Sequence, residues 1–141
     1  IIGDTAILLT KVNSIKKKPK HFIGIDAGMN TLIRPMLYDA YHEIYLANNL
    51  NSKNKNKVTI VGQICESTDM FAKDRLMPEI NENDILAILN AGAYGFSMSS
   101  TYGCKPRPAE VLVSGNKHEL IRKRQTIQDL TNNQIIPSRL K

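Results

Sequence analysis

The residues best suited to chemistry lie in two short runs. Residues 63–69 (QICESTD) place the thiol of Cys65 beside the carboxylate of Glu66, directly after an apolar stretch. Further along the chain, residues 91–95 (AGAYG) present the phenol of Tyr94 on a glycine-flanked turn. These groups suit proton transfer and the recognition of a charged amino acid. None of them is an electron sink, so the sequence predicts part of an active site whose remaining groups lie elsewhere.

A cation and a second phenol lie earlier in the chain. Arg34 and Tyr38 are four residues apart, so on a helix their side chains converge on one side. A guanidinium that binds a carboxylate through two hydrogen bonds, with a phenol beside it, is a sensible pair for amino-acid recognition. A surface arginine next to a half-buried tyrosine is the alternative that the spacing leaves open.

Cys65 and Tyr94 each have a structural alternative as well. A protonated thiol can donate a proton, and a neighbouring carboxylate opposes its ionisation, which favours an acid over a nucleophile. Cys65 could equally be a structural cysteine in the core, and Tyr94 a core tyrosine at a tight corner. The three histidines are scattered and no CxxC pair is present, so the sequence predicts neither a Cys/His protease site nor a zinc site.

The pattern of the chain predicts an all-β domain, a sandwich or barrel with a few short helices. Runs rich in β-forming residues, bounded by Gly, Pro, Asn and Lys, predict strands at residues 5–12, 21–26, 43–47, 58–65, 84–90, 109–113 and 119–121. A short helix is expected from Pro35 to about Tyr41, with Arg34 as its cap, because proline disfavours helical backbone in the residue before it.

A second helix is expected from Thr126, where Asp129 completes an acidic variant of a capping box. The Asn- and Lys-rich residues 48–57 are expected to form an exposed hairpin loop between two strands. We expect residues 1–131 to form one domain and residues 132–141 to form a polar, loosely ordered tail.

The composition narrows the class of protein. With 141 residues, 42% of them hydrophobic and 23% charged, the chain is typical of a globular domain. No stretch is long and apolar enough for a membrane span, and no signal peptide is expected in this segment, whose first residue, Ile1, suggests a processed or truncated start.

The net charge of +6 is concentrated in lysine-rich runs without interleaved aromatics, so no nucleic-acid partner is expected. Two cysteines form no disulfide framework, which favours free thiols in the cytoplasm.

Read together, four runs resemble the C-terminal part of the diaminopimelate decarboxylases, a family in the alanine-racemase-like group of enzymes that depend on pyridoxal phosphate. They occur in the family's order, at plausible spacing and over most of the chain. The runs are residues 26–38 (DAGMNTLIRPMLY), 62–69 (GQICESTD), 92–95 (GAYG) and 102–113 (YGCKPRPAEVLV). Each run alone is weak evidence, whereas their joint occurrence is specific.

The resemblance implies decarboxylation of meso-diaminopimelate to L-lysine and CO2, with pyridoxal 5'-phosphate as cofactor. It implies that Arg34 and Tyr38 bind a substrate carboxylate and that Glu66 binds the ammonium group at the far end of the substrate. Cys65 matches the residue proposed as proton donor, and Tyr94 a tyrosine near cofactor and substrate. Such enzymes combine a (β/α)8 barrel, which carries the Schiff-base lysine, with a β-rich domain, and work as head-to-tail homodimers with shared active sites.

The sequence also departs from the family pattern. The cofactor lysine, the glycine-rich phosphate loop and the barrel that carries them are absent, so this chain alone is expected to be inactive. Thr68 stands where the family commonly has glycine, and Cys104 where it has asparagine. Rival interpretations are a related decarboxylase of ornithine, arginine or carboxynorspermidine, which Glu66 disfavours, a basic nucleic-acid-binding β-barrel, and a purely structural dimerisation domain.

Overall fold

A computed structural model describes residues 2–53 and 56–140 of the chain. It divides into two compact units, Ile1–Ser99 and Ser100–Lys141, and each is described by itself. The expected grouping of residues 1–131 into one domain, followed by a loosely ordered tail, stays a prediction.

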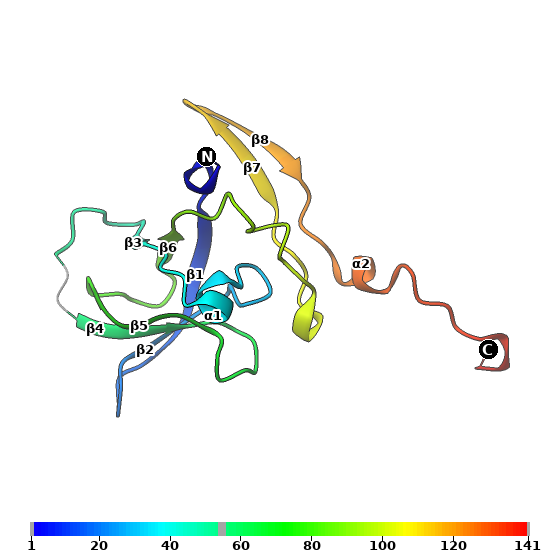
Figure 1. Ribbon diagram of the computed structural model, residues 1–141, viewed down its shortest axis with the longest axis horizontal. Coiled ribbons are helices and arrows are strands. Elements are labelled where there is room, and N and C mark those ends of the chain that lie inside the picture. Colours follow the sequence, from blue (N-terminus) through cyan, green and yellow to red (C-terminus); the bar gives the residue numbers. More distant parts are fainter. Residues whose placement is uncertain (1, 54–55, 141) are drawn as a thin grey trace. The chain divides into compact units, whose positions relative to one another are not determined.

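The first unit is built on a curved sheet. Within the described residues its strands follow the order β3-β6-β1-β2-β4-β5, and every neighbouring pair is antiparallel except β2 and β4, which are parallel. The sheet is nearly closed into a barrel (Figure 1). Between its two edge strands, the side chain of Arg75 on β5 donates to the backbone carbonyl oxygen of His42, next to β3. The predicted all-β class is confirmed. The strand bounds are β1 (Leu8–Lys16), β2 (Phe22–Ile25), β3 (Ile44–Leu46), β4 (Asn56–Val61), β5 (Met70–Met77) and β6 (Ile85–Ile88).

The core of this unit follows the two-residue period of its strands. On β3, Ile44 and Leu46 are buried while Tyr45 between them is partly exposed. Full burial of such an aliphatic side chain stabilises the fold by about 1.5–3 kcal/mol. The most deeply buried apolar residues come from four strands and one loop, and are Val12, Ile23, Ile25, Leu32, Val58, Ile60, Leu86 and Ile88.

One strand was not predicted and another is shorter than expected. β5 contains the consecutive charged residues 73–75, and Asp74 has a left-handed φ of 49°, so the segment lacks the alternation by which strands are recognised. β4 ends at Val61 rather than at Cys65, because the backbone N–H of Gly62 donates to the carbonyl oxygen of Asp69 at 2.8 Å and closes a turn.

The expectation that residues 48–57 form a hairpin loop is also wrong. The chain there connects β3 to β4, which are not neighbours in the sheet, so it is a connection between separate strands. Residues 54 and 55 of this segment lie outside the described residues.

The first helix, α1 (Arg34–Tyr38), begins earlier and ends sooner than predicted. Ile33 is its N-cap and Arg34 is already helical, with Pro35 in the first turn, where a missing N–H costs no intrahelical hydrogen bond. Asp39 ends the helix by adopting a left-handed φ of 52° while its N–H bonds the carbonyl oxygen of Arg34. The expected extension to Tyr41 is therefore wrong, and the helix is a single turn that carries both Arg34 and Tyr38.

The second unit contains a two-stranded hairpin and a short helix. β7 (Glu110–Ser114) pairs with β8 (Lys117–Arg122), and the ion pair between Arg122 Nε and Glu110 Oε2, 2.6 Å apart, links their far ends. α2 (Ile127–Thr131) has the predicted capping box, in which Thr126 and Asp129 bond each other's backbone N–H. Short 3-10 turns lie at Gly3–Thr5, Tyr102–Cys104 and Ser138–Leu140.

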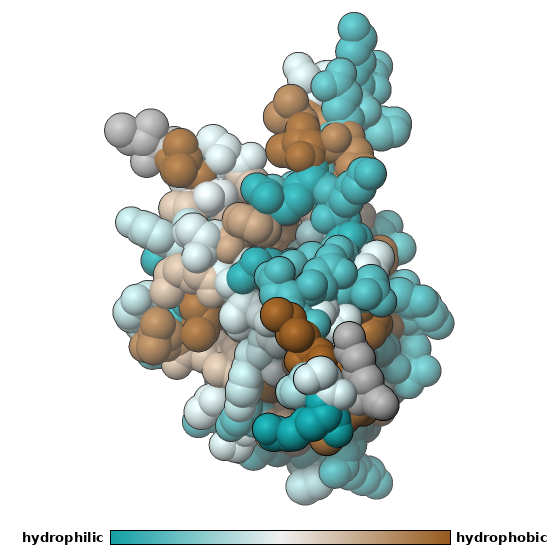
Figure 2. Space-filling model, turned by 90° about the vertical axis from the view of Figure 1, so that its right-hand side faces the viewer, coloured by the Kyte–Doolittle hydropathy of each residue, from teal (hydrophilic) through white to brown (hydrophobic). Residues whose placement is uncertain are grey.

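Large apolar side chains are exposed on both units. On the hairpin, Val111, Val113 and Ile121 each keep more than half of their surface accessible. On the face drawn in Figure 2, several hydrophobic patches, coloured brown, lie among hydrophilic residues, coloured teal. Over the described part of the chain, no helix has the length and apolar character needed to cross a membrane.

Candidate active site

Three of the five predicted site residues meet in one cluster on the first unit. The guanidinium carbon of Arg34 lies 5.9 Å from the ring centre of Tyr38 and 5.2 Å from that of Tyr94. The two rings are 59% and 57% exposed, and Arg34 is half-buried, so the cluster faces solvent. Two aromatic rings restrict the guanidinium and attract it by about 0.5–1 kcal/mol each. An arginine restricted in this way is prepared to bind a carboxylate through its planar fork.

The turn that carries Tyr94 depends on its flanking glycines, as predicted. A Cβ at Gly92 would collide with the carbonyl oxygen of Ile2, and a Cβ at Gly95 would collide with that of Ala91. Tyr94 itself has a φ of 65°, a left-handed conformation that is uncommon for a bulky residue. Strain of this kind is held by the surrounding structure and is frequent at functional sites.

Because Gly92 has no room for a side chain, we predict that Gly92→Ala lowers the free energy of unfolding by about 1–3 kcal/mol. Urea denaturation measures the change. Gly3→Ala is the matched control, since a Cβ at Gly3 meets nothing within 4 Å. Equal stabilities of the two variants would contradict the prediction.

Cys65 and Glu66 lie on the turn that joins β4 to β5. Both are exposed, and the thiols of Cys65 and Cys104 are free, as expected. The carboxylate of Asp69 holds this turn, because it accepts hydrogen bonds from the backbone N–H of Ile64 at 2.7 Å and of Met29 at 2.8 Å. The second of these bonds ties the turn to the loop that leads into α1.

Further hydrogen bonds join the two segments. The backbone N–H of Gln63 donates to the carbonyl oxygen of Ala27 at 3.1 Å, and its side-chain amide donates to that of Asp26 at 2.5 Å. Asp26 in turn accepts from the hydroxyl of Thr10 at 2.6 Å and from the backbone N–H of Lys11 at 2.8 Å. The structure therefore places Cys65 and Glu66 on a turn that is anchored beside the segment carrying Arg34 and Tyr38.

No role was predicted from the sequence for three of these supporting residues. Thr10, Asp26 and Asp69 are polar, and Thr10 and Asp69 are buried, yet their partners lie 15 or more residues away or on backbone groups. Asp26 and Asp69 mark the edges of the runs described above, which was the one available signal. Among the residues that the structure describes, no group of three His, Cys, Asp or Glu side chains could hold a metal ion.

Burial raises the pKa of Asp69 above its ordinary value, while the N–H groups of Ile64 and Met29 act in the opposite direction. A carboxyl with a raised pKa binds its proton more tightly in the folded chain than in the unfolded one. Its titration thus contributes stability below the unfolded pKa of 3.8, and that contribution is lost as the pH rises through the folded pKa.

We therefore predict that the stability difference between the wild type and Asp69→Asn is larger at about pH 3 than at about pH 7. The asparagine variant removes the titration and also one of the two acceptor oxygens, so it is the less stable protein at both pH values. Urea denaturation across this pH range measures the difference. A difference that grows with pH would show that the pKa of Asp69 is lowered by folding.

Comparison with known proteins identifies the fold. Residues 3–92 match the family model described as pyridoxal-dependent decarboxylase, C-terminal sheet domain. A diaminopimelate decarboxylase of Methanothermobacter thermautotrophicus is 52% identical over 140 residues, which cover 99% of this chain and 33% of the relative. One of Archaeoglobus fulgidus is 46% identical over 97% of this chain and 33% of its own length.

A solved structure agrees with these sequence matches. The diaminopimelate decarboxylase of M. jannaschii, crystallised with L-lysine, superposes with a TM-score of 0.92 at 41% identity. The superposition covers 99% of this chain and 32% of that one. This chain thus spans about a third of the length of the relatives it matches. From its curved sheet and the match over residues 3–92, the chain belongs to the C-terminal sheet domain family of pyridoxal-dependent decarboxylases.

Proposed function

We propose that the protein containing this chain is a diaminopimelate decarboxylase, which uses pyridoxal 5'-phosphate to convert meso-2,6-diaminopimelate into L-lysine and CO2. This reaction is the last step of lysine biosynthesis. The observation that carries the proposal is the half-buried guanidinium of Arg34 held beside the exposed rings of Tyr38 and Tyr94, in a chain 52% identical to an enzyme of that name.

Arg34 would bind a carboxylate of the substrate. Its half-buried guanidinium is restricted by two rings, so little side-chain freedom remains to be lost when a planar carboxylate binds. The phenol of Tyr38, exposed on the same helical turn, would donate a further hydrogen bond to that carboxylate.

Glu66 and Arg34 together would distinguish diaminopimelate from simpler diamino acids. The substrate carries an ammonium and a carboxylate at each end, whereas lysine and ornithine carry only an ammonium at the far end. An exposed carboxylate on the turn anchored by Asp69 is suited to bind the distal ammonium group. Because lysine and ornithine also carry that ammonium, discrimination against them would come from the second carboxylate, which a guanidinium such as that of Arg34 can bind.

Cys65 would supply the proton that the product needs. Pyridoxal phosphate, when bound, delocalises the electron pair that the departing CO2 leaves on the α-carbon. The thiol of Cys65 is exposed and would hold a proton toward that carbon until it is transferred. The residues here fit an anionic cofactor, because the exposed phenol of Tyr94 and the half-buried guanidinium of Arg34 are hydrogen-bond donors, and the Schiff-base lysine would lie outside this chain.

We further propose that the enzyme is a cytoplasmic homodimer with shared active sites. Two copies would assemble head to tail, so that Cys65 of one protomer serves the site of the other. The exposure of Cys65 and Glu66 on an anchored turn supports this arrangement, since neither side chain is buried in the core of its own unit.

The test is CO2 release by the full-length polypeptide with pyridoxal phosphate, using meso-diaminopimelate as substrate and L-ornithine as control. Activity on diaminopimelate alone is expected. Activity on ornithine instead would move the protein to a sister decarboxylase and leave Glu66 without the assigned role. Inactivity on both substrates would refute the proposal.

A further inference from the structure

The cluster of Arg34, Tyr38 and Tyr94 has two parts, the turn α1 and the turn that carries Tyr94. The segment between α1 and β3, residues 39–43, is bonded to the backbone that leads to Tyr94. His42 lies in this segment and is 2% exposed. Its Nδ1 donates to the carbonyl oxygen of Leu89 at 2.8 Å, and the backbone N–H of Leu89 donates to the carbonyl oxygen of Glu43 at 2.8 Å. Arg34 and Tyr38 lie just before His42 in sequence, and Tyr94 lies just after Leu89. These two hydrogen bonds therefore join the backbone on which Arg34 and Tyr38 are carried to the backbone that carries Tyr94.

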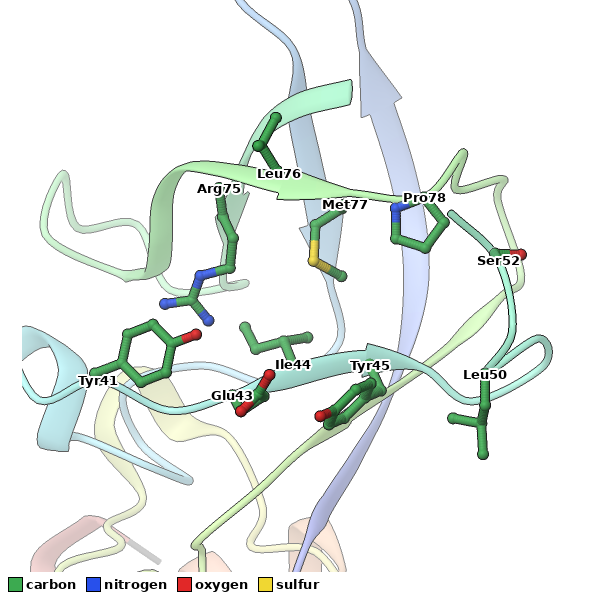
Figure 3. A pocket seen from close by; sticks show the side chains of 10 residues that line it. All are labelled: Tyr41, Glu43, Ile44, Tyr45, Leu50, Ser52, Arg75, Leu76, Met77 and Pro78. Atoms are coloured by element: carbon green, nitrogen blue, oxygen red, sulfur yellow. The ribbon is translucent and has the colours of Figure 1, made fainter. Parts of the chain in front are cut away.

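Arg75 holds the same segment from the opposite side. It lies on β5, an edge strand of the sheet, and its Nη1 donates to the backbone carbonyl oxygen of His42. Its guanidinium carbon also lies 4.3 Å from the ring centre of Tyr41. Figure 3 shows Arg75 directed from β5 toward Tyr41, in a pocket of about 260 Å³ that Glu43 also lines.

We propose that His42 and Arg75 are positioning residues, which fix the distance between the Arg34–Tyr38 turn and Tyr94. His42 acts where the paired strands β3 and β6 end, through its bond to Leu89. Arg75 acts across the gap between the edge strands β3 and β5, which no backbone pairing joins. The catalytic part of this inference rests on the proposed function, because it assigns the distance to carboxylate binding.

The residue types fit these roles. An arginine stacks on a ring and donates to a carbonyl at the same time, because its donors lie in the plane of the guanidinium. A lysine keeps the charge but cannot do both. The ring of His42 supplies a short, rigid donor at Nδ1, which an asparagine amide can replace, whereas a leucine leaves the partly buried carbonyl oxygen of Leu89 without that partner.

The first measurement is steady-state kinetics of the full-length holoenzyme on meso-diaminopimelate. Arg75→Ala is expected to lower kcat/KM by roughly tenfold to a hundredfold, chiefly through a higher KM, because a misplaced Arg34 fork binds the carboxylate poorly. Arg75→Lys should recover only part of this loss. Lys73→Ala, an exposed basic residue on the same strand, is the control and should match the wild type.

His42 is tested by rescue in the same assay. His42→Leu should raise KM as Arg75→Ala does, and His42→Asn should restore most of the wild-type value. Equal KM values for Arg75→Ala and Lys73→Ala, or a fall in kcat alone, would overturn the inference.

A second measurement needs no activity and separates this inference from the proposed function. Hydrogen exchange, followed by mass spectrometry, is compared in peptides covering residues 39–47, 89–99 and 22–25. Arg75→Ala should speed exchange in the first two peptides together and leave the third, in β2, unchanged. Faster exchange in all three peptides, or in residues 39–47 alone, would overturn the coupling, even in a protein whose substrate proved to be different.

Discussion

Arg34→Ala lowers kcat/KM for meso-diaminopimelate by roughly a hundredfold to a thousandfold, with most of the change in KM. The guanidinium is expected to form two parallel hydrogen bonds with a substrate carboxylate, and alanine leaves that carboxylate without this partner. The two rings that restrict Arg34 strengthen the effect, because they hold its fork in place before substrate binds. Steady-state kinetics of the full-length enzyme measures the change.

Two further variants make the result interpretable. Arg34→Lys keeps the charge and loses the planar fork, so its KM should lie between those of the wild type and the alanine variant. Arg139→Ala removes an exposed arginine in the second unit and should have no effect on kinetics. An alanine variant at position 34 with an unchanged KM would show that the carboxylate is bound elsewhere.

Cys65→Ala lowers kcat by roughly a hundredfold to ten-thousandfold while KM changes little. The thiol is assigned to proton transfer at the α-carbon, a step that is absent from substrate binding. Single-turnover formation of L-lysine, measured beside the KM, separates the two contributions.

The chain provides its own control for this experiment. Cys104 is a second free and exposed thiol, and Cys104→Ala should leave kcat unchanged. If the two alanine variants had the same kcat as the wild type, Cys65 would lie near the reaction without taking part in it.

The fold was predictable where its signals are local. Short runs rich in β-forming residues predicted the positions of β2, β3, β6 and the hairpin, and Thr126 with Asp129 predicted the start of α2. β5 was missed because its outward charged residues and the left-handed Asp74 conceal the strand period. The expectation for Arg34 failed because a steric preference before proline was weaker than the hydrogen bonds of the helical turn.

The candidate site shows the same division between local and distant effects. The four-residue spacing of Arg34 and Tyr38 places both on one turn, which sequence alone indicates. Tyr94 joins them only because β6 and the segment around His42 bring distant backbone together. The support that Asp69 gives to the turn of Cys65 likewise depends on a hydrogen bond to Met29, across 40 residues, which no sequence pattern encodes.

The parallel pairing of β2 with β4 has a consequence for the order of folding. All residues between these two strands, 26–55, must close as a loop before the pair can form, and they include α1 and β3. Closing a flexible loop of about 30 residues costs about 3 kcal/mol of chain entropy beyond a constant. Contacts at such sequence separation slow folding relative to hairpins. Arg34 lies within this loop, and its contact with Tyr94 spans a still longer separation, so we expect that contact to form late in folding.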